Sequence, residues 1–131
     1  MLVEDSDDDA ALFAIGVRKS GHLVQVDRAI NADQARRLMT RRWPSLVVLD
    51  FHLPGGSGLD LLREIREQAA YRRVPVIIMS GTESDADVES AYRVGVNSFI
   101  RKPCAFDEYV SRVGLLLEYW LRQNFTGTSF L

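Results

Sequence analysis

Cysteine is almost absent from this sequence. Cys104 is the single cysteine among 131 residues, which excludes an internal disulfide and a zinc site built from several cysteines. Long apolar runs are missing too: no stretch approaches the roughly 18 apolar residues that a bilayer-spanning helix requires, and no signal-peptide pattern is present. We therefore expect a cytoplasmic protein without a membrane-spanning segment.

An excess of positive charge is also lacking. The 16 Lys and Arg residues are mixed along the chain with 18 Asp and Glu residues, for a formal net charge of −2. A nucleic-acid surface requires clustered Lys and Arg, so we expect no nucleic-acid partner. The apolar fraction of 47% is ordinary for a globular protein, and a chain of this length can form one domain with a buried core.

Strand and helix patterns alternate along the chain. Apolar runs predict strands at residues 1–4, 22–29, 45–49, 74–80 and 97–101, and apolar residues at helical spacing predict helices at 10–19, 32–42, 58–68, 85–94 and 106–121. This alternation predicts an α/β fold of five βα units, with a parallel sheet that carries helices on both faces. We expect one domain over residues 1–123 and a short tail, rich in Gly, Thr and Ser, over residues 124–131.

Polar and charged residues lie at the ends of four of the five predicted strands. The first strand ends with Glu4 and Asp5, the third with Asp50 and the fourth with Ser80, and Lys102 follows the fifth. The carboxyl ends of parallel strands meet at one edge of a sheet, so these groups should converge. Two unit charges about 4 Å apart repel by about 4 kcal/mol at an effective dielectric of 20, and a hard cation such as Mg²⁺ would relieve that repulsion. A reachable carboxylate beside a cation, a hydroxyl and an ammonium group is typical of a nucleophile that accepts a phosphoryl group.

Four segments resemble the receiver domain of two-component response regulators. They are "VED" at 3–5, "LDFHLPGGSG" at 49–58, "IIMSG" at 77–81 and "FIRKP" at 99–103, and the resemblance extends to about Arg122. It implies a flavodoxin-like, doubly wound (βα)5 fold with a five-stranded parallel sheet in the order 2-1-3-4-5. It also implies a phosphoacceptor that assists its own phosphotransfer and dephosphorylation rather than an enzyme in the usual sense.

The resemblance assigns the acceptor and the metal ligands. Asp50 is the phosphoacceptor. Asp5 and Asp50 bind Mg²⁺ through their side chains, Glu4 acts through a metal-bound water, and the backbone carbonyl of His52 completes the protein's share of ligands. The family often has Asp in place of Glu4, so the side chain here has a longer reach.

The resemblance also assigns the phosphoryl contacts and the switch. Ser80 and Lys102 contact the phosphoryl oxygens, and in such receivers phosphorylation draws the hydroxyl of Ser80 inward. Phe99 then changes position, and the surface formed by the fourth helix, the fifth strand and the fifth helix changes with it. Phe99 stands where the family often has Tyr, so its movement would depend on packing. The Lys102–Pro103 bond is a candidate cis peptide.

Two neighbours of the acceptor are expected to tune dephosphorylation. His52 lies two residues after Asp50, and Thr82 lies two residues after Ser80, so both could alter the access of water to the acyl phosphate. We expect His52 to be an exposed loop side chain rather than a catalytic base. The acids of Asp7–Asp9 are instead expected at a helix N-terminus, where they interact favourably with the helix dipole.

The last predicted helix is apolar over a wide arc. Within little more than two turns it carries Leu115, Leu116, Leu117, Tyr119, Trp120 and Leu121, whereas one buried face needs a stripe of about 100°. We favour a partner surface over a fully buried helix, and expect a homodimer through the fourth helix, the fifth strand and the fifth helix. This ending resembles single-domain receivers that serve phytochrome-type histidine kinases.

Two functions of different classes remain open. The leading hypothesis is a phosphoacceptor that relays a signal from a histidine kinase by protein–protein contact. The alternative is a phosphorylation-independent, receiver-like interaction or dimerisation module, which an absence of Mg²⁺ binding would favour. A flavodoxin-like cofactor carrier is disfavoured because the acidic run after the first strand would repel a cofactor phosphate. A haloacid-dehalogenase-type phosphatase is disfavoured because His52 occupies the place of its second acid.

Overall fold

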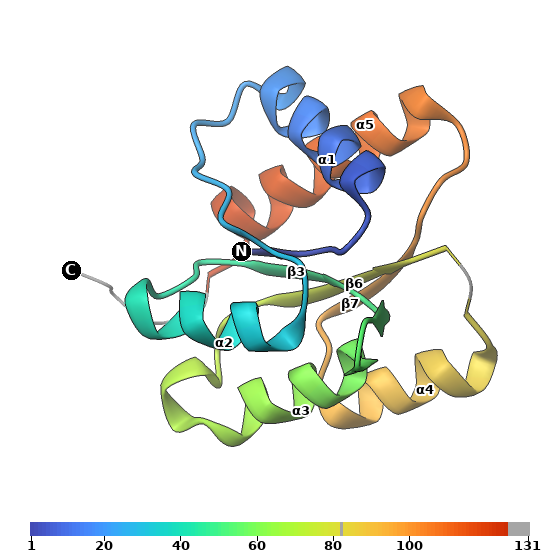
Figure 1. Ribbon diagram of the computed structural model, residues 1–131. Helices are drawn as coiled ribbons and strands as arrows, with labels where there is room; N and C mark the ends of the chain where they lie inside the picture. Colours follow the sequence, from blue (N-terminus) through green and yellow to red (C-terminus); the bar gives the residue numbers. More distant parts are fainter. Residues whose placement is uncertain (82, 126–131) are drawn as a thin grey trace.

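A five-stranded parallel sheet forms the centre of the computed structural model, which describes residues 1–81 and 83–125 (Figure 1). Its strands are β1 (Leu2–Val3), β2 (Arg28–Ala29), β3 (Val47–Asp50), β6 (Val76–Ser80) and β7 (Ser98–Arg101), in the order β2-β1-β3-β6-β7. Because β4 and β5 form a separate hairpin, this order is the expected 2-1-3-4-5, and the flavodoxin-like prediction is confirmed. Thr82 and the tail residues 126–131 lie outside the described residues.

Five helices cover the two faces of the sheet (Figure 1). On one face lie α2 (Ala32–Arg41), α3 (Gly58–Glu67) and α4 (Asp85–Val94), and on the other lie α1 (Asp7–Ser20) and α5 (Phe106–Leu117). A short 3₁₀ helix, η1 (Ala69–Tyr71), follows α3, and a π-helical segment, η2 (Glu118–Gln123), continues α5. In the described part of the chain, no helix is both long and apolar enough to cross a bilayer.

The apolar strands are buried on both sides. In β6, Val76 and Ile78 pack with α2, α3 and α4, whereas Ile77 and Met79 pack with α1 and α5. All four are at most 2% exposed. Burying an aliphatic side chain of this size contributes about 1.5–3 kcal/mol, so the uninterrupted apolar run stabilises contacts with both helix layers.

The start of α1 is set by a side-chain cap. The hydroxyl of Ser6 accepts a hydrogen bond from the backbone N–H of Asp9 at 3.2 Å, which satisfies one of the first free N–H groups of the helix. Therefore α1 begins at Asp7, three residues before the predicted start at residue 10, and the three acids occupy its first turn as expected.

The second strand is much shorter than predicted. Leu2 pairs with Arg28 and Val3 with Ala29, and these two residues are all that β1 provides for pairing. Residues 22–27 consequently lie outside the sheet, and the side chain of Leu23 is fully exposed. Apolar alternation alone cannot reveal this, because strand length depends on the neighbouring strand.

A small antiparallel hairpin that the sequence analysis missed follows Asp50. It pairs β4 (His52–Leu53) with β5 (Gly56–Ser57) across the Pro-Gly turn. Next to it, α3 begins at Gly58, which packs against the backbone of Asp50. A Cβ atom at Gly58 would lie 2.2 Å from the backbone oxygen of Asp50, so only glycine permits this close approach.

Candidate functional site

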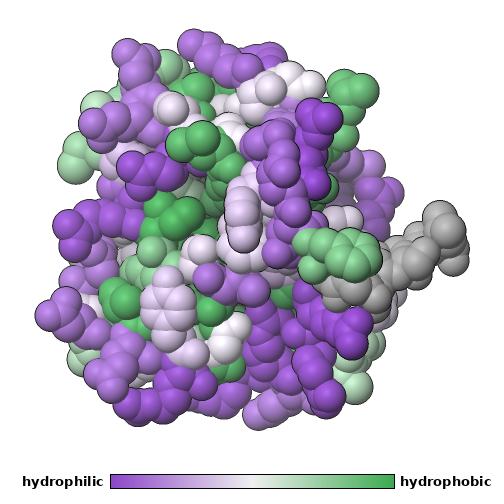
Figure 2. Space-filling model, turned by 180° about the vertical axis from the view of Figure 1, so that it is seen from behind, coloured by the Kyte–Doolittle hydropathy of each residue, from purple (hydrophilic) through white to green (hydrophobic). Residues whose placement is uncertain are grey.

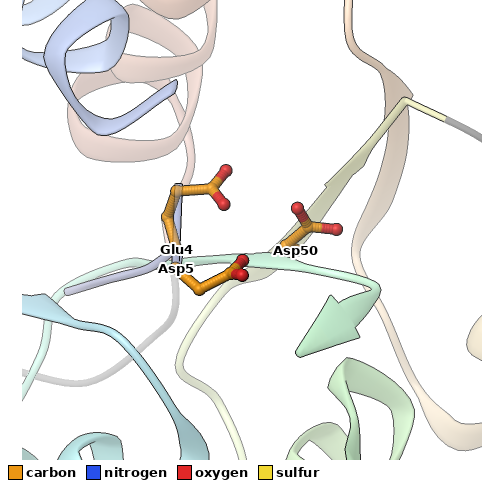
Figure 3. Close-up of side chains that lie close together, drawn as sticks. All are labelled: Glu4, Asp5 and Asp50. Atoms are coloured by element: carbon orange, nitrogen blue, oxygen red, sulfur yellow. The ribbon is translucent and has the colours of Figure 1, made fainter. Parts of the chain in front are cut away.

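The parallel register brings the acidic ends of β1 and β3 side by side. Val3 pairs with Leu49, which places Glu4 level with Asp50. Glu4 and Asp5 leave the end of β1, Asp50 lies at the end of β3, and their carboxyl groups turn toward a shared space (Figure 3). One carboxylate oxygen of each residue lies within 4.8 Å of the others.

The next two strands add the predicted hydroxyl and ammonium group. Asp50 pairs with Met79, so Ser80 lies one residue further along the adjacent strand, where it is completely buried. Ser80 pairs in turn with Arg101, and the backbone N–H of Lys102 donates to the carbonyl oxygen of Ser80 at 2.8 Å. Thus all five residues expected at this edge do converge there.

Lys102 contacts three carboxylates at once. Its Nζ lies 2.7 Å from Glu4 Oε1, 2.7 Å from Asp9 Oδ2 and 2.9 Å from Asp50 Oδ2. The side chain is only 13% exposed. Burial alone would lower the pKa of Lys102, but the hydrogen bonds to Asp9, Glu4 and Asp50 raise it above its ordinary value. Lys102 is therefore a permanent positive charge at this site.

The carboxylates of the buried Glu4 and the partly buried Asp50 have further donors. Glu4 Oε2 accepts from the backbone N–H of Ser6 at 3.2 Å, and Asp50 Oδ1 accepts from that of His52 at 3.0 Å. Burial raises the pKa of Glu4, although the hydrogen bond from Lys102 opposes that shift. Asp5, by contrast, is exposed. Asp50 thus remains accessible through a partly open edge while its carboxylate is held by two donors.

This donor set fits a divalent cation. All three groups within 4.8 Å of one another are carboxylates, and hard cations prefer such oxygen ligands. Each carboxylate has about four lone-pair sites, so the bonds from Lys102 and the backbone leave capacity for a metal. Mg²⁺ takes one or two carboxylates and keeps several waters, which suits an edge open at Asp5. The carbonyl of His52 stays a predicted ligand.

Phe99 and His52, the predicted switch and tuning residues, both lie near Phe51, the neighbour of Asp50. Phe99 is half-buried with its ring centroid 5.9 Å from that of Phe51, and its backbone N–H donates to the hydroxyl of Tyr92 on α4 at 3.2 Å. His52 is exposed, as expected, and its ring lies 5.2 Å from that of Phe51. Thr82 lies outside the described residues.

The cis-peptide prediction is wrong. The described residues contain no cis peptide bond, so the Lys102–Pro103 bond is trans. A trans X-Pro bond is intrinsically favoured by about 0.5–1 kcal/mol. With it, Lys102 already reaches all three of its carboxylate partners, so the site needs no cis bond to place the ammonium group.

Asp9 is the site residue that the sequence analysis missed. We placed it only at a helix N-terminus, yet its carboxylate bonds Lys102. The spacing of residues in α1 could have indicated this contact. Asp9 lies one helical turn before Phe13, which is buried in the core between α1 and α5. A polar residue on the buried face of this helix, in the turn nearest the carboxyl ends of the strands, can contact residues at those strand ends.

Comparisons with known proteins agree with this geometry. A sequence profile of the response regulator receiver domain matches residues 1–114. The probable methanogenesis regulatory protein FilR2 of Methanothrix harundinacea is 29% identical over 130 residues, covering 95% of this chain and 84% of that protein. The chain spans about half the length of several other curated relatives that it matches.

Solved structures share the fold over nearly the whole chain. The phosphorylated cyanobacterial phytochrome response regulator RcpA superposes with a TM-score of 0.90 at 25% identity, covering 97% of this chain and 96% of that one. The Mn²⁺-bound form of response regulator Rcp1 superposes with a TM-score of 0.85 at 24% identity, covering 95% and 94%. At that identity the second likeness shows the fold alone.

Replacing Asp5 should weaken divalent-cation binding. We expect Asp5→Asn to raise the Kd for Mg²⁺ at least about tenfold, because it removes an exposed carboxylate from the three-acid cluster without disturbing Lys102. Isothermal titration calorimetry with Mg²⁺ measures this. The matched control is Asp8→Asn, which removes an equal charge from the exposed first turn of α1. Equal losses in both variants would contradict a ligand role for Asp5.

Proposed function

The chain belongs to the response regulator receiver domain family, and from that premise we propose that it takes a phosphoryl group from a histidine kinase onto Asp50 in a Mg²⁺-dependent reaction. Receiver domains of this family are phosphoacceptors rather than classical enzymes. The observation that supports Asp50 as the acceptor is its position: a 13%-exposed carboxylate at a strand end, 2.9 Å from the Lys102 ammonium and beside two further acids.

The proposed transfer uses these groups directly. An oxygen of the Asp50 carboxylate forms a bond to phosphorus while the bond from phosphorus to the donor's histidine nitrogen breaks, and the electron pair stays on that nitrogen. In this proposal Lys102, whose ammonium lies 2.9 Å from Asp50, donates to a phosphoryl oxygen, and Ser80, at the end of the neighbouring strand β6, donates its hydroxyl hydrogen to another. A bound Mg²⁺ would reduce the negative charge that accumulates among the acids.

Phosphorylation of Asp50 is the first test. With Mg²⁺ and acetyl phosphate, we expect intact-mass spectrometry to show the addition of one phosphoryl group, because a small phosphodonor can reach the partly exposed carboxylate. The Asp50→Asn variant, with an amide that is a poor nucleophile, should gain nothing, and EDTA should suppress the gain in the parent chain.

The outcome separates the two candidate functions. No mass gain in a folded parent chain, at any Mg²⁺ concentration and with any phosphorylated kinase tried, would leave the phosphorylation-independent interaction module. The likeness to RcpA, a phytochrome response regulator, supports a phytochrome-type kinase as partner. Transfer from such a kinase that is no faster than from an unrelated histidine kinase would contradict that partner.

We propose that His52 and Thr82 tune the lifetime of the acyl phosphate. The exposed His52 ring lies two residues from the acceptor, on the edge that water must cross. His52→Ala should shorten the lifetime by a factor of about ten or less, which corresponds to about 1.4 kcal/mol or less in barrier height, and Thr82→Ala should also change it. The decay of the phosphorylated mass after donor removal measures both.

The control for this measurement is Thr40→Ala, an exposed threonine on α2. An acyl-phosphate lifetime that is unchanged in both His52→Ala and Thr82→Ala would contradict the proposal. A lifetime changed equally in the control would point to a general loss of stability instead.

The output surface proposed for the switch is formed by α4, β7 and α5, and we name it the α4–β7–α5 surface. Its exposed large side chains include Tyr92 on α4 and Leu115 on α5, at 51% and 65%, and Tyr119, at 52%, follows in η2. Seen from behind, the molecule shows apolar patches set among hydrophilic side chains (Figure 2). Of the apolar arc expected at the chain's last helix, Leu116 and Leu117 are buried instead.

Two contacts at this surface support the proposed switch. The backbone N–H of Phe99 bonds the Tyr92 hydroxyl, and Arg101 Nε lies 2.5 Å from Glu83 Oε1 in the loop after Ser80. A movement of Ser80 toward a phosphoryl group would therefore strain contacts made by both α4 and β7. Phosphorylation can shift this equilibrium only by its differential affinity for the two arrangements.

A homodimer through this surface should depend on Leu115. We expect Leu115→Ser to raise the dimer dissociation constant about tenfold, because a buried apolar anchor contributes more than 1 kcal/mol at many interfaces. Sedimentation velocity of the phosphorylated and unphosphorylated chain measures it, with Leu23→Ser, an exposed leucine in the loop between α1 and β2, as the control. A monomeric parent in both states contradicts the dimer, and equal dissociation constants in the two states contradict its control by phosphorylation.

A further inference from the structure

The ammonium group of Lys102 has no donor to spare. An ammonium carries three N–H bonds, and the three carboxylates of Glu4, Asp9 and Asp50 accept all of them at 2.7–2.9 Å. A phosphoryl oxygen on Asp50 can be bonded only if Lys102 releases or shares one of these donors. Which carboxylate releases it decides how tightly the site holds a phosphoryl group.

Asp9 differs from the other two carboxylate partners of Lys102 in its position in the structure. Glu4 and Asp50 belong to the three-acid cluster that fits a cation, whereas Asp9 does not, and it reaches Lys102 from the first turn of α1. Its backbone is held in place by the Ser6 cap at 3.2 Å, and its carbonyl oxygen faces the hydroxyl of the buried Tyr109 at 3.5 Å. The backbone of Asp9 is therefore held by contacts that involve none of the three acids of the cation cluster.

We propose that Asp9 is a positioning residue that competes with the phosphoryl group for Lys102. In the unphosphorylated chain it holds the ammonium group at the site. Once a phosphoryl group is present, the same hydrogen bond draws one donor of Lys102 away from the phosphoryl oxygens. Asp9 thereby weakens the phosphorylated state and keeps the switch reversible. This inference rests on the proposed phosphoacceptor function of Asp50.

The neighbouring acids provide a matched comparison. Asp8 occupies the same helical turn and carries the same charge but is exposed, and Asp7 pairs with Arg28 at 2.8 Å. The effect of Asp8→Asn on anion binding therefore reports general charge removal near the site. Any additional effect of Asp9→Asn reports the weakening of the charged contact with Lys102.

Affinity for a phosphoryl mimic tests the proposal. With saturating Mg²⁺, we expect Asp9→Asn to bind beryllofluoride (BeF₃⁻) about tenfold more tightly than the parent chain, because the neutral amide oxygen of Asn accepts a weaker hydrogen bond and so competes less for one ammonium donor. Asp9→Glu, which keeps the charge, should restore an affinity close to that of the parent, and Asp8→Asn should change it little. Titration calorimetry with BeF₃⁻ measures all four chains.

Binding of Mg²⁺ alone gives the second readout. Without Asp9, Lys102 bonds more strongly with Glu4 and Asp50, so Asp9→Asn should bind the cation no more tightly than the parent chain while it binds the anion more tightly. A purely structural role would weaken both. Circular dichroism confirms that each variant is folded, since the Ser6 cap uses the backbone of residue 9.

The outcomes distinguish a failure of the proposed role of Asp9 from a failure of the proposed phosphoacceptor function. If the parent chain binds BeF₃⁻ and accepts a phosphoryl group but Asp9→Asn binds no more tightly than Asp8→Asn, the role of Asp9 is overturned and the proposed function stands. If the parent chain neither binds BeF₃⁻ nor accepts a phosphoryl group, both are overturned.

Discussion

The candidate site at the carboxyl ends of the strands depends on one interaction, the ion cluster around Lys102. One ammonium group, 13% exposed, joins carboxylates from the end of β1, the start of α1 and the end of β3. Unpaired acids at such distances would repel one another by several kcal/mol. The lysine follows β7, the last strand along the chain, so three parts of the chain that are distant in sequence, residues 4–9, Asp50 and Lys102, meet through a single side chain.

The rest of the fold delivers these groups to one place. Two-sided burial of β3 and β6 secures the register that sets Glu4, Asp50 and Ser80 side by side. Gly58 lets α3 begin against the backbone of Asp50, which keeps the acid at a rigid strand end while the turn leaves it open to solvent. A precise site on rigid elements with one open side is what group transfer to a fixed carboxylate requires.

The same strands connect the acidic edge with a distant surface. Ser80 is buried at the end of β6 and hydrogen-bonded through its carbonyl to the backbone of Lys102, while Phe99 on β7 is bonded to Tyr92 on α4. In the proposed function, a change of charge at Asp50 would act on groups attached to both sides of β7. Neighbouring strands would carry this coupling through packing and hydrogen bonds.

The sequence by itself determined the order of strands and helices, the two-sided burial of the central strands, and the residues Glu4, Asp5, Asp50, Ser80 and Lys102 as a group. These follow from local patterns and from the rule that parallel strands end at one edge. Only the tertiary structure decided the short β2, the trans bond before Pro103 and the contact of Asp9 with Lys102. Each of these features depends on which atoms contact the residue in the folded chain. The spacing of residues along a single sequence does not show those contacts. For Asp9 in particular, a favourable interaction with the helix dipole accounted for the residue until the structure showed its contact with the lysine 93 positions away.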